Sequence, residues 1–109
     1  MTKKRSYSRE KIERSLAIVD KKLKEGNPLR ASRALTVAFN YARDYEGPDK
    51  NNYLERIRQN ALTIGQDKSL KDYEYEPVQD IEDEAEVLLK ARKSNIEGLL
   101  LGIIVLLVI

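Results

Sequence analysis

The 109-residue chain contains no cysteine, no histidine and no tryptophan. Without cysteine no disulfide can form, so nothing in the sequence indicates an oxidising compartment. The lack of thiolate and imidazole groups excludes the usual zinc sites and the Cys–His and Ser–His catalytic pairs. No nucleophile–base pair or metal-binding group can be assembled from the side chains that remain. We therefore expect the chain not to be an enzyme and to need no cofactor.

The charged residues are arranged in blocks of predominant sign, although the net charge is only +2. Residues 1–33 carry eleven lysines and arginines against four acidic residues, whereas residues 72–86 carry eight acidic residues and no basic one. Charge sorted in this way can direct packing within a domain, the choice of partner or the approach to a membrane. One option is that the acidic stretch docks on the basic first helix of its own domain.

The first part of the chain has the pattern of a helical hairpin. Apolar residues at helical intervals predict a helix over residues 9–25, with Ser8 as its N-cap and Gly26 in the left-handed position that ends it. A second helix is predicted over residues 28–46, with a proline at its first position. The short break between them predicts an antiparallel pair. The apolar stripe of the first helix consists of Ile12, Leu16, Val19 and Leu23.

The rest of the chain predicts one or two further helices and a linker. A third helix is expected to begin at Asp49 or Asn51 and to end at Gly65. Residues 66–79 are polar and acidic and include Pro77, which predicts an extended linker. A fourth helix is expected from about Asp80, where acidic residues in the first turn suit the helix dipole.

The last twelve residues contain no polar side chain. A helix of this length rises about 18 Å, whereas the hydrocarbon core of a bilayer is about 30 Å thick, so a buried core helix or an interfacial segment is the alternative. Three observations favour a membrane segment: it is apolar on every side, the domain has too few apolar residues to enclose it, and Lys90, Arg92 and Lys93 precede it as cytoplasmic flanking charges. The segment comprises Gly98, Leu99, Leu100, Leu101, Gly102, Ile103, Ile104, Val105, Leu106, Leu107, Val108 and Ile109.

The expected fold is all-α: a small bundle of three to four helices with an antiparallel hairpin, followed by a C-terminal membrane helix. Its N-terminal domain is expected in the cytoplasm, since no signal peptide precedes it. Two interpretations of the C-terminus stay open, a short tail anchor or a longer chain interrupted within its first membrane helix. The expected organisation is a basic arm at 1–7, a three-helix domain at 8–65, an acidic linker at 66–79, a fourth helix at 80–97 and the membrane segment at 98–109.

The turn between the first two predicted helices resembles that of a tetratricopeptide repeat. Gly26 and the small and large residues that follow it have that family's spacing, namely Ala31, Leu35 and Ala38, and Ile18 matches its leucine. Val19, Lys22 and Arg43 depart from the small, aromatic and proline positions of the family, and the match covers one repeat of about 34 residues. The resemblance implies a groove that binds a protein partner.

These features predict a membrane-anchored cytoplasmic adaptor or assembly domain that mediates protein–protein interaction. The alternative is the regulatory N-terminal domain of a larger membrane enzyme or transporter whose chemistry lies beyond residue 109. Expected partners are membrane lipid and either another protein or a second copy of the chain. Nucleic acid is not expected, because a wide basic face with placed aromatic residues is missing. The predicted partner-binding residues, on the concave side of the hairpin, are Arg30, Arg33, Asn40 and Tyr41.

Overall fold

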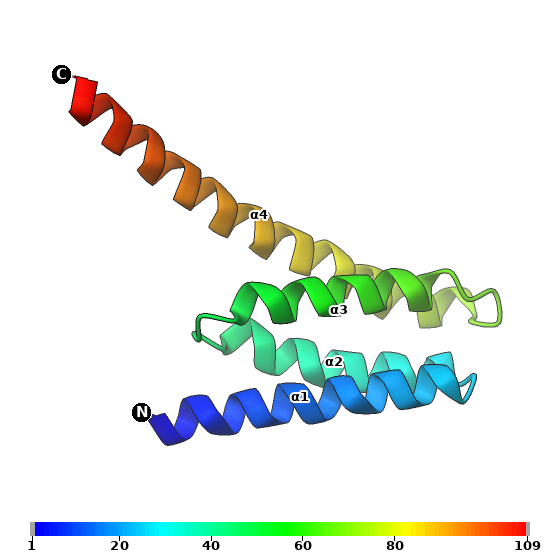
Figure 1. The fold of residues 1–109 in the computed structure, drawn as a ribbon. Helices are drawn as coiled ribbons and strands as arrows, with labels where there is room; N and C mark the ends of the chain where they lie inside the picture. The colour runs from blue at the N-terminus through cyan, green and yellow to red at the C-terminus, as the bar shows by residue number, and fades with distance from the viewer. Residues whose placement is uncertain (1, 109) are drawn as a thin grey trace.

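The structure, a computed structural model, describes the backbone of residues 2–108 and the side chains of residues 8–91. This part of the chain forms four α-helices and no strand (Figure 1), so the all-α prediction is confirmed. The helices are α1 (Thr2–Lys24), α2 (Pro28–Asp44), α3 (Lys50–Gly65) and α4 (Asp72–Val108).

The turn between α1 and α2 is closed by Gly26, which has a φ of +73°. Its N–H donates to the Leu23 carbonyl at 3.1 Å, and the next N–H, of Asn27, donates to the Lys22 carbonyl at 2.9 Å. This pair of bonds is the Schellman arrangement, which requires a left-handed residue that glycine supplies most easily. The Asn27 side chain then caps α2 by accepting from the Arg30 N–H at 3.2 Å. The predicted antiparallel hairpin is confirmed.

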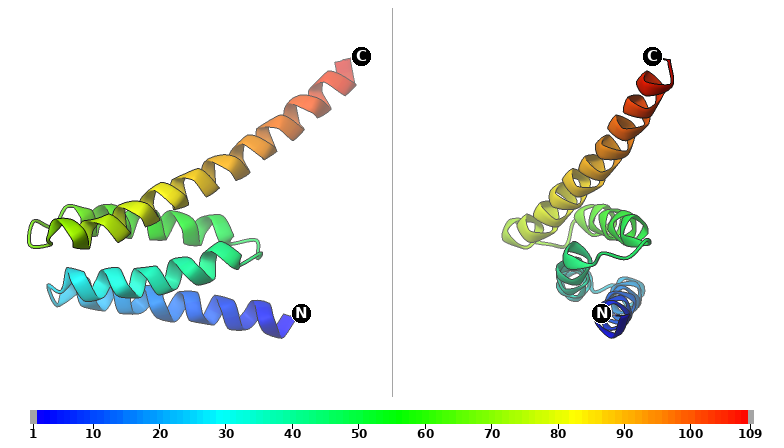
Figure 2. Two further views of the ribbon diagram at one scale, coloured as in Figure 1. Left: turned by 180° about the vertical axis from the view of Figure 1, so that it is seen from behind. Right: turned by 90° about the vertical axis from the view of Figure 1, so that its left-hand side faces the viewer.

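Two helical hairpins stack on each other to form the bundle. α1 packs mainly on α2, α3 packs mainly on α4, and α2 lies against both α3 and α4 (Figure 2). The predicted docking of the acidic stretch on the first helix is wrong, because α1 and α4 make no contact in the described part of the chain. The largest fully buried side chains of the shared core come from all four helices and are Ile12, Leu16, Val19, Leu35, Leu54, Ile57, Ile64 and Val78.

Helix α1 begins earlier than predicted. It is helical from Thr2, so the prediction of a separate basic arm over residues 1–7 is wrong for 2–7, and Ser8 lies inside the helix instead of capping it. The physical reason is that residues 2–8 contain no glycine or proline, while lysine and arginine are good helix formers. The side chains of residues 2–7 lie outside the described range.

Helix α4 also begins earlier, within the segment predicted to be an extended linker. That prediction is wrong over residues 72–79, which are helical. The Lys71 N–H donates to the Glu74 carboxylate at 2.8 Å, which is half of a capping box. Leu70 is buried and Tyr75 packs against the same core, at the spacing of a hydrophobic staple. These local contacts start the helix upstream of Pro77, which it accommodates in its second turn.

Helix α4 continues without a break to Val108, and its C-terminal part leads away from the other three helices (Figure 1). Within the described part of the chain, no helix is long and apolar enough to cross a membrane. The side chains of the predicted segment 98–109, and those of Arg92 and Lys93, lie outside the described range. The membrane helix therefore stays a prediction at this point.

Candidate interaction surfaces

The four predicted partner-binding residues lie on one side of α2. Arg30, Arg33 and Asn40 are exposed, and Tyr41 is partly buried. Their spacing of three, seven and one residues places them on neighbouring turns of the same helix face. Val37 stands among them with 45% of its surface exposed. The structure thus brings these residues together, but the two grooves described below are lined by other side chains.

A polar groove of about 520 Å³ runs between α1 and α3. It is open to solvent and presents carboxamide groups beside charges of both signs. Its lining residues are Asp20, Asn52, Glu55, Arg56, Gln59 and Asn60. The sequence did not predict this groove. The α3 residues that line it have the pattern of a solvent-exposed helix face, and they line a groove because α1 packs beside α3.

A second, mostly apolar groove of about 270 Å³ lies between α2 and α4. Arg43 lines it from α2, with its guanidinium carbon 5.8 Å from the centre of the Phe39 ring. Asp83, Val87 and Leu88 line it from α4, together with Glu84. Val87 is 65% exposed, which leaves this edge of the α4 apolar face open to solvent.

The solvent face of α4 is strongly acidic. Asp72, Glu76, Asp80, Asp83 and Glu84 are all exposed, and within the described side chains none of them forms an ion pair. Arg43 of α2 lines the same groove as Asp83 and Glu84, but its ion pair is with Asp44 of its own helix. The positive charge of Arg58 on α3 acts at longer range on Glu82 and Glu86, while its hydrogen bonds go to Glu55. Near the end of the described range, Lys90 pairs with Glu86 at 3.0 Å and is mostly exposed.

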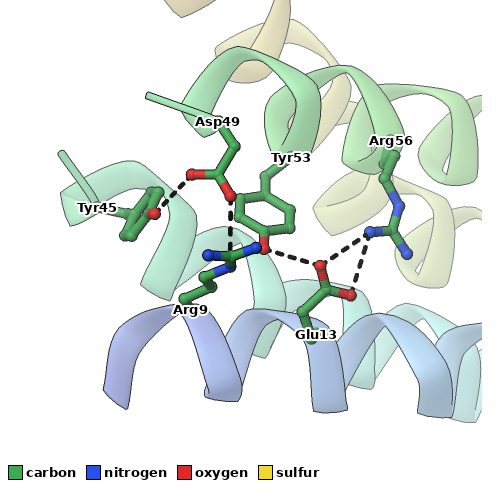
Figure 3. A network of polar contacts seen from close by, with 6 residues as sticks. All are labelled: Arg9, Glu13, Tyr45, Asp49, Tyr53 and Arg56. Atoms are coloured by element: carbon green, nitrogen blue, oxygen red, sulfur yellow. Dashed lines mark hydrogen bonds and ion pairs between the residues drawn. The ribbon is translucent and has the colours of Figure 1, made fainter. Parts of the chain in front are cut away.

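A network of aromatic and charged side chains joins α1 to the start of α3 (Figure 3). The Tyr53 hydroxyl donates to Glu13 Oε1 at 2.8 Å, and Arg56 Nη1 donates to the same carboxylate at 3.3 Å. On the other side of the ring, Tyr45 donates to Asp49 Oδ1 at 2.5 Å, and Arg9 Nε lies 3.5 Å from Asp49 Oδ2. Asp49 is the N-cap residue of α3, yet its side chain forms these contacts instead of a capping bond. The network was not predicted, since its members are about 40 residues apart.

The network shifts the pKa of several of its members. The hydrogen bond from Tyr53, followed by the contact with Arg56, holds the pKa of Glu13 below its ordinary value. The hydrogen bond from Tyr45 and the charge of Arg9 lower the pKa of Asp49. Burial and the hydrogen bond to Glu13 raise the pKa of Tyr53 to about 12. All three groups therefore keep their ordinary charge at neutral pH, which indicates a structural role rather than acid–base catalysis.

No group of three or more metal-ligating side chains is present among the residues whose side chains are described. Comparison with known proteins identifies no relative: no family model, no curated protein and no solved structure matches the chain. The resemblance to a tetratricopeptide repeat consequently stays a prediction that rests on the turn residues alone.

Proposed function

We propose that the chain is a helical assembly domain that the C-terminal part of α4 holds at a membrane, with the bundle on the cytoplasmic side. The observation that carries this proposal is the continuity of α4. One unbroken helix contributes Val78, Ile81 and Ala85 to the core and then leads into the apolar segment 98–108. Such a helix would connect the domain rigidly to its anchor.

The length and composition of the end of α4 support the anchor. Residues 94–109 contain one charged side chain, Glu97, and as a helix they would rise about 24 Å, a large part of a hydrocarbon core. The backbone of this segment points away from the bundle (Figure 2), so the other helices do not offer it a packing surface. Apolar side chains exposed to water cost roughly 25 cal/mol per Å², which favours lipid as their surroundings.

The outer surface of the bundle supports the role in assembly. Ile18, Val37, Tyr73 and Val87 are the large apolar side chains that are exposed in the described range. They lie on α1, α2 and α4, near exposed charged side chains, and exposed apolar residues with a charged surround are a common composition for a protein–protein interface. The polar groove between α1 and α3 adds side chains that can donate to and accept from a partner backbone.

The anchor is tested with the full chain expressed in cells. We expect it to stay with alkali-washed membranes and its bundle to be digested by protease added to the cytoplasmic side. The variant Leu101→Arg/Leu106→Arg should be released, because each arginine at the centre of a membrane helix costs about 2.5–3.5 kcal/mol. The matched control Leu101→Ile/Leu106→Ile should stay bound. Release of the unaltered chain by alkali, or protection of the bundle from cytoplasmic protease, would contradict the proposal.

A further inference from the structure

We propose that the partner of this domain is a second copy of the same chain, bound head to tail: the acidic outer face of α4 in one copy docks on the basic outer face of α1 and α2 in the next. The acidic outer face consists of Tyr73, Glu76, Asp80, Asp83 and Val87. The basic outer face consists of Ile18, Lys22, Arg30, Arg33 and Val37. The inference names the partner for the assembly role proposed above and rests on that role.

The exposed apolar side chains are divided equally between these two faces. Ile18 and Val37 are 43% and 45% exposed, and Tyr73 and Val87 are 68% and 65% exposed. Each pair can form the apolar centre of an interface, whereas a single exposed apolar residue is ordinary on a protein surface.

Helix geometry fixes the side of α1 on which Ile18 lies. Glu13 bonds to Tyr53 of α3, and Asp20 lines the groove with α3, so both mark the flank of α1 that faces α3. At 100° per residue, Ile18 is about 140–160° around the helix from these two residues. It therefore lies on the flank of α1 away from α3, and Lys22, one turn further along, is partly covered there.

The charges of the two faces are complementary, and within one copy Lys22 is the member that forms an ion pair in the described range, with Glu25 at 3.1 Å. Arg30 and Arg33 are exposed and form no ion pair in the described range, and the same holds for Asp80 and Asp83. Within one chain α1 and α4 make no contact. Where α2 meets α4, the basic residue beside Asp83 and Val87 is Arg43, which is not part of the basic outer face. Complementary potentials on an interface speed association and fix the register of the partners.

The stacking geometry favours a second copy over an unrelated partner. Within one chain the α1–α2 hairpin already packs on the α3–α4 hairpin, and a head-to-tail contact adds the next hairpin in the same direction (Figure 2). A heterologous contact relates neighbouring copies by one repeated rotation and translation, so the C-terminal end of α4 leaves every copy on the same side when the rotation axis lies along the membrane normal. Copies anchored in one membrane can adopt this arrangement.

The test uses the full chain in vesicles of neutral phosphatidylcholine, with donor and acceptor dyes on an introduced Thr63→Cys, which is the sole cysteine. Energy transfer between unaltered copies should be present at low salt and fall at high salt. Arg30→Glu/Arg33→Glu and Asp80→Lys/Asp83→Lys should each weaken association more than about tenfold, because both place like charges opposite each other. Mixing these two variants, or combining all four changes in one chain, should restore the transfer.

The control Lys24→Glu/Lys68→Glu lowers the net charge by the same amount as Arg30→Glu/Arg33→Glu. It alters exposed lysines outside both faces, so its energy transfer should equal that of the unaltered chain. Circular dichroism checks that each variant is folded. Transfer that persists in both charge-reversed variants, as contacts between apolar tails alone would give, overturns the inference, and so does a mixture that fails to restore it. Flotation of the same samples reads out anchoring separately: a chain that does not float contradicts the proposed membrane anchor, while the charge-reversal series in solution still decides the contact.

Discussion

Both outer helices bury apolar side chains in the shared core, but they differ in the polar contacts that they make with α3. α1 reaches α3 through directional polar contacts at one end, where Glu13 bonds to Tyr53 and Arg56, and Arg9 meets Asp49. α4 reaches α2 and α3 through apolar side chains, among them Val78, Ile81 and Ala85. The charge of Arg58 acts on the α4 carboxylates only at longer range.

Because of this difference, the polar contacts of α1 and the apolar contacts of α4 should respond differently to salt and pH. Polar contacts between charged groups weaken with salt and with protonation, whereas apolar burial does not depend on protonation and is not weakened by charge screening. The acidic charges of α4 are thus not needed to hold the helix in place. They remain available on its solvent face, which is the surface that the head-to-tail contact uses.

The largest expected effect is on the apolar attachment of α4. Ile81→Ala removes buried methyl groups and should lower the free energy of unfolding by about 2–4 kcal/mol. Urea unfolding of the full chain in detergent micelles measures this, and hydrogen exchange should show faster exchange along residues 78–89. Val87→Ala, on the exposed side of the same helix, should change stability by less than about 0.5 kcal/mol. Equal effects of the two changes would mean that α4 is not held by apolar contacts.

The second-largest loss of stability is expected from a substitution at the junction of α2 and α3. A methyl group at Gly47 would overlap the Tyr45 ring, so Gly47→Ala should displace that ring from Asp49 and cost about 1–3 kcal/mol. The comparison variant is Gly65→Ala, where an added methyl group meets no atom within 4 Å. We expect Gly65→Ala to be neutral or slightly stabilising. Thermal unfolding compares the two variants, and a neutral Gly47→Ala would show that Tyr45 is not confined.

The polar attachment of α1 should depend on pH. Because the pKa of Glu13 is lowered on folding, its contribution is present above the ordinary value of 4.5 and is lost as the pH falls through the lowered pKa. Tyr53→Phe removes the main cause of that shift and should cost about 0.5–1.5 kcal/mol at neutral pH and less in acid. Unfolding measured across this range tests the difference. A cost that is the same at both ends would argue against the hydrogen bond as its source.

At high pH the same hydroxyl gives a second signature. Since the pKa of Tyr53 is raised to about 12, its contribution is present below the ordinary value of 10.0 and is lost as the pH rises through about 12. Spectroscopic titration of the folded chain should show a late tyrosine ionisation at about pH 12, above the ordinary tyrosine value of 10.0. Tyr53→Phe should remove this late step, and Tyr73→Phe should leave it.

The smallest effect is expected from the long-range charge on α4. Arg58→Gln removes the positive charge near Glu82 and Glu86 and also the bonds to Glu55. Exposed pairs of this kind are screened by water and salt, so the decrease in stability should be smaller than for Tyr53→Phe and should vanish at high salt. A loss as large as that of Ile81→Ala would reverse the comparison between the two attachments.

The sequence by itself determined the local features. The apolar stripes predict the packed faces, and Gly26 predicts the turn, because both depend on the period of the helix and on the backbone freedom of one residue. The starts of α1 and α4 were missed. In the case of α4, the capping contact of Glu74 and the packing of Leu70 on Tyr75 were present in the pattern, but the acidic composition and Pro77 outweighed them in the prediction.

Only the tertiary structure decided which helix surfaces meet. The network between Glu13 and Tyr53 and the groove between Asp20 and Asn60 join residues about 40 positions apart, and no local pattern encodes such a distance. The tertiary structure also decided that α4 packs on α2 and α3 and not on α1. A helix pattern fixes which side is apolar, whereas the neighbour of that side depends on how all four helices share one core.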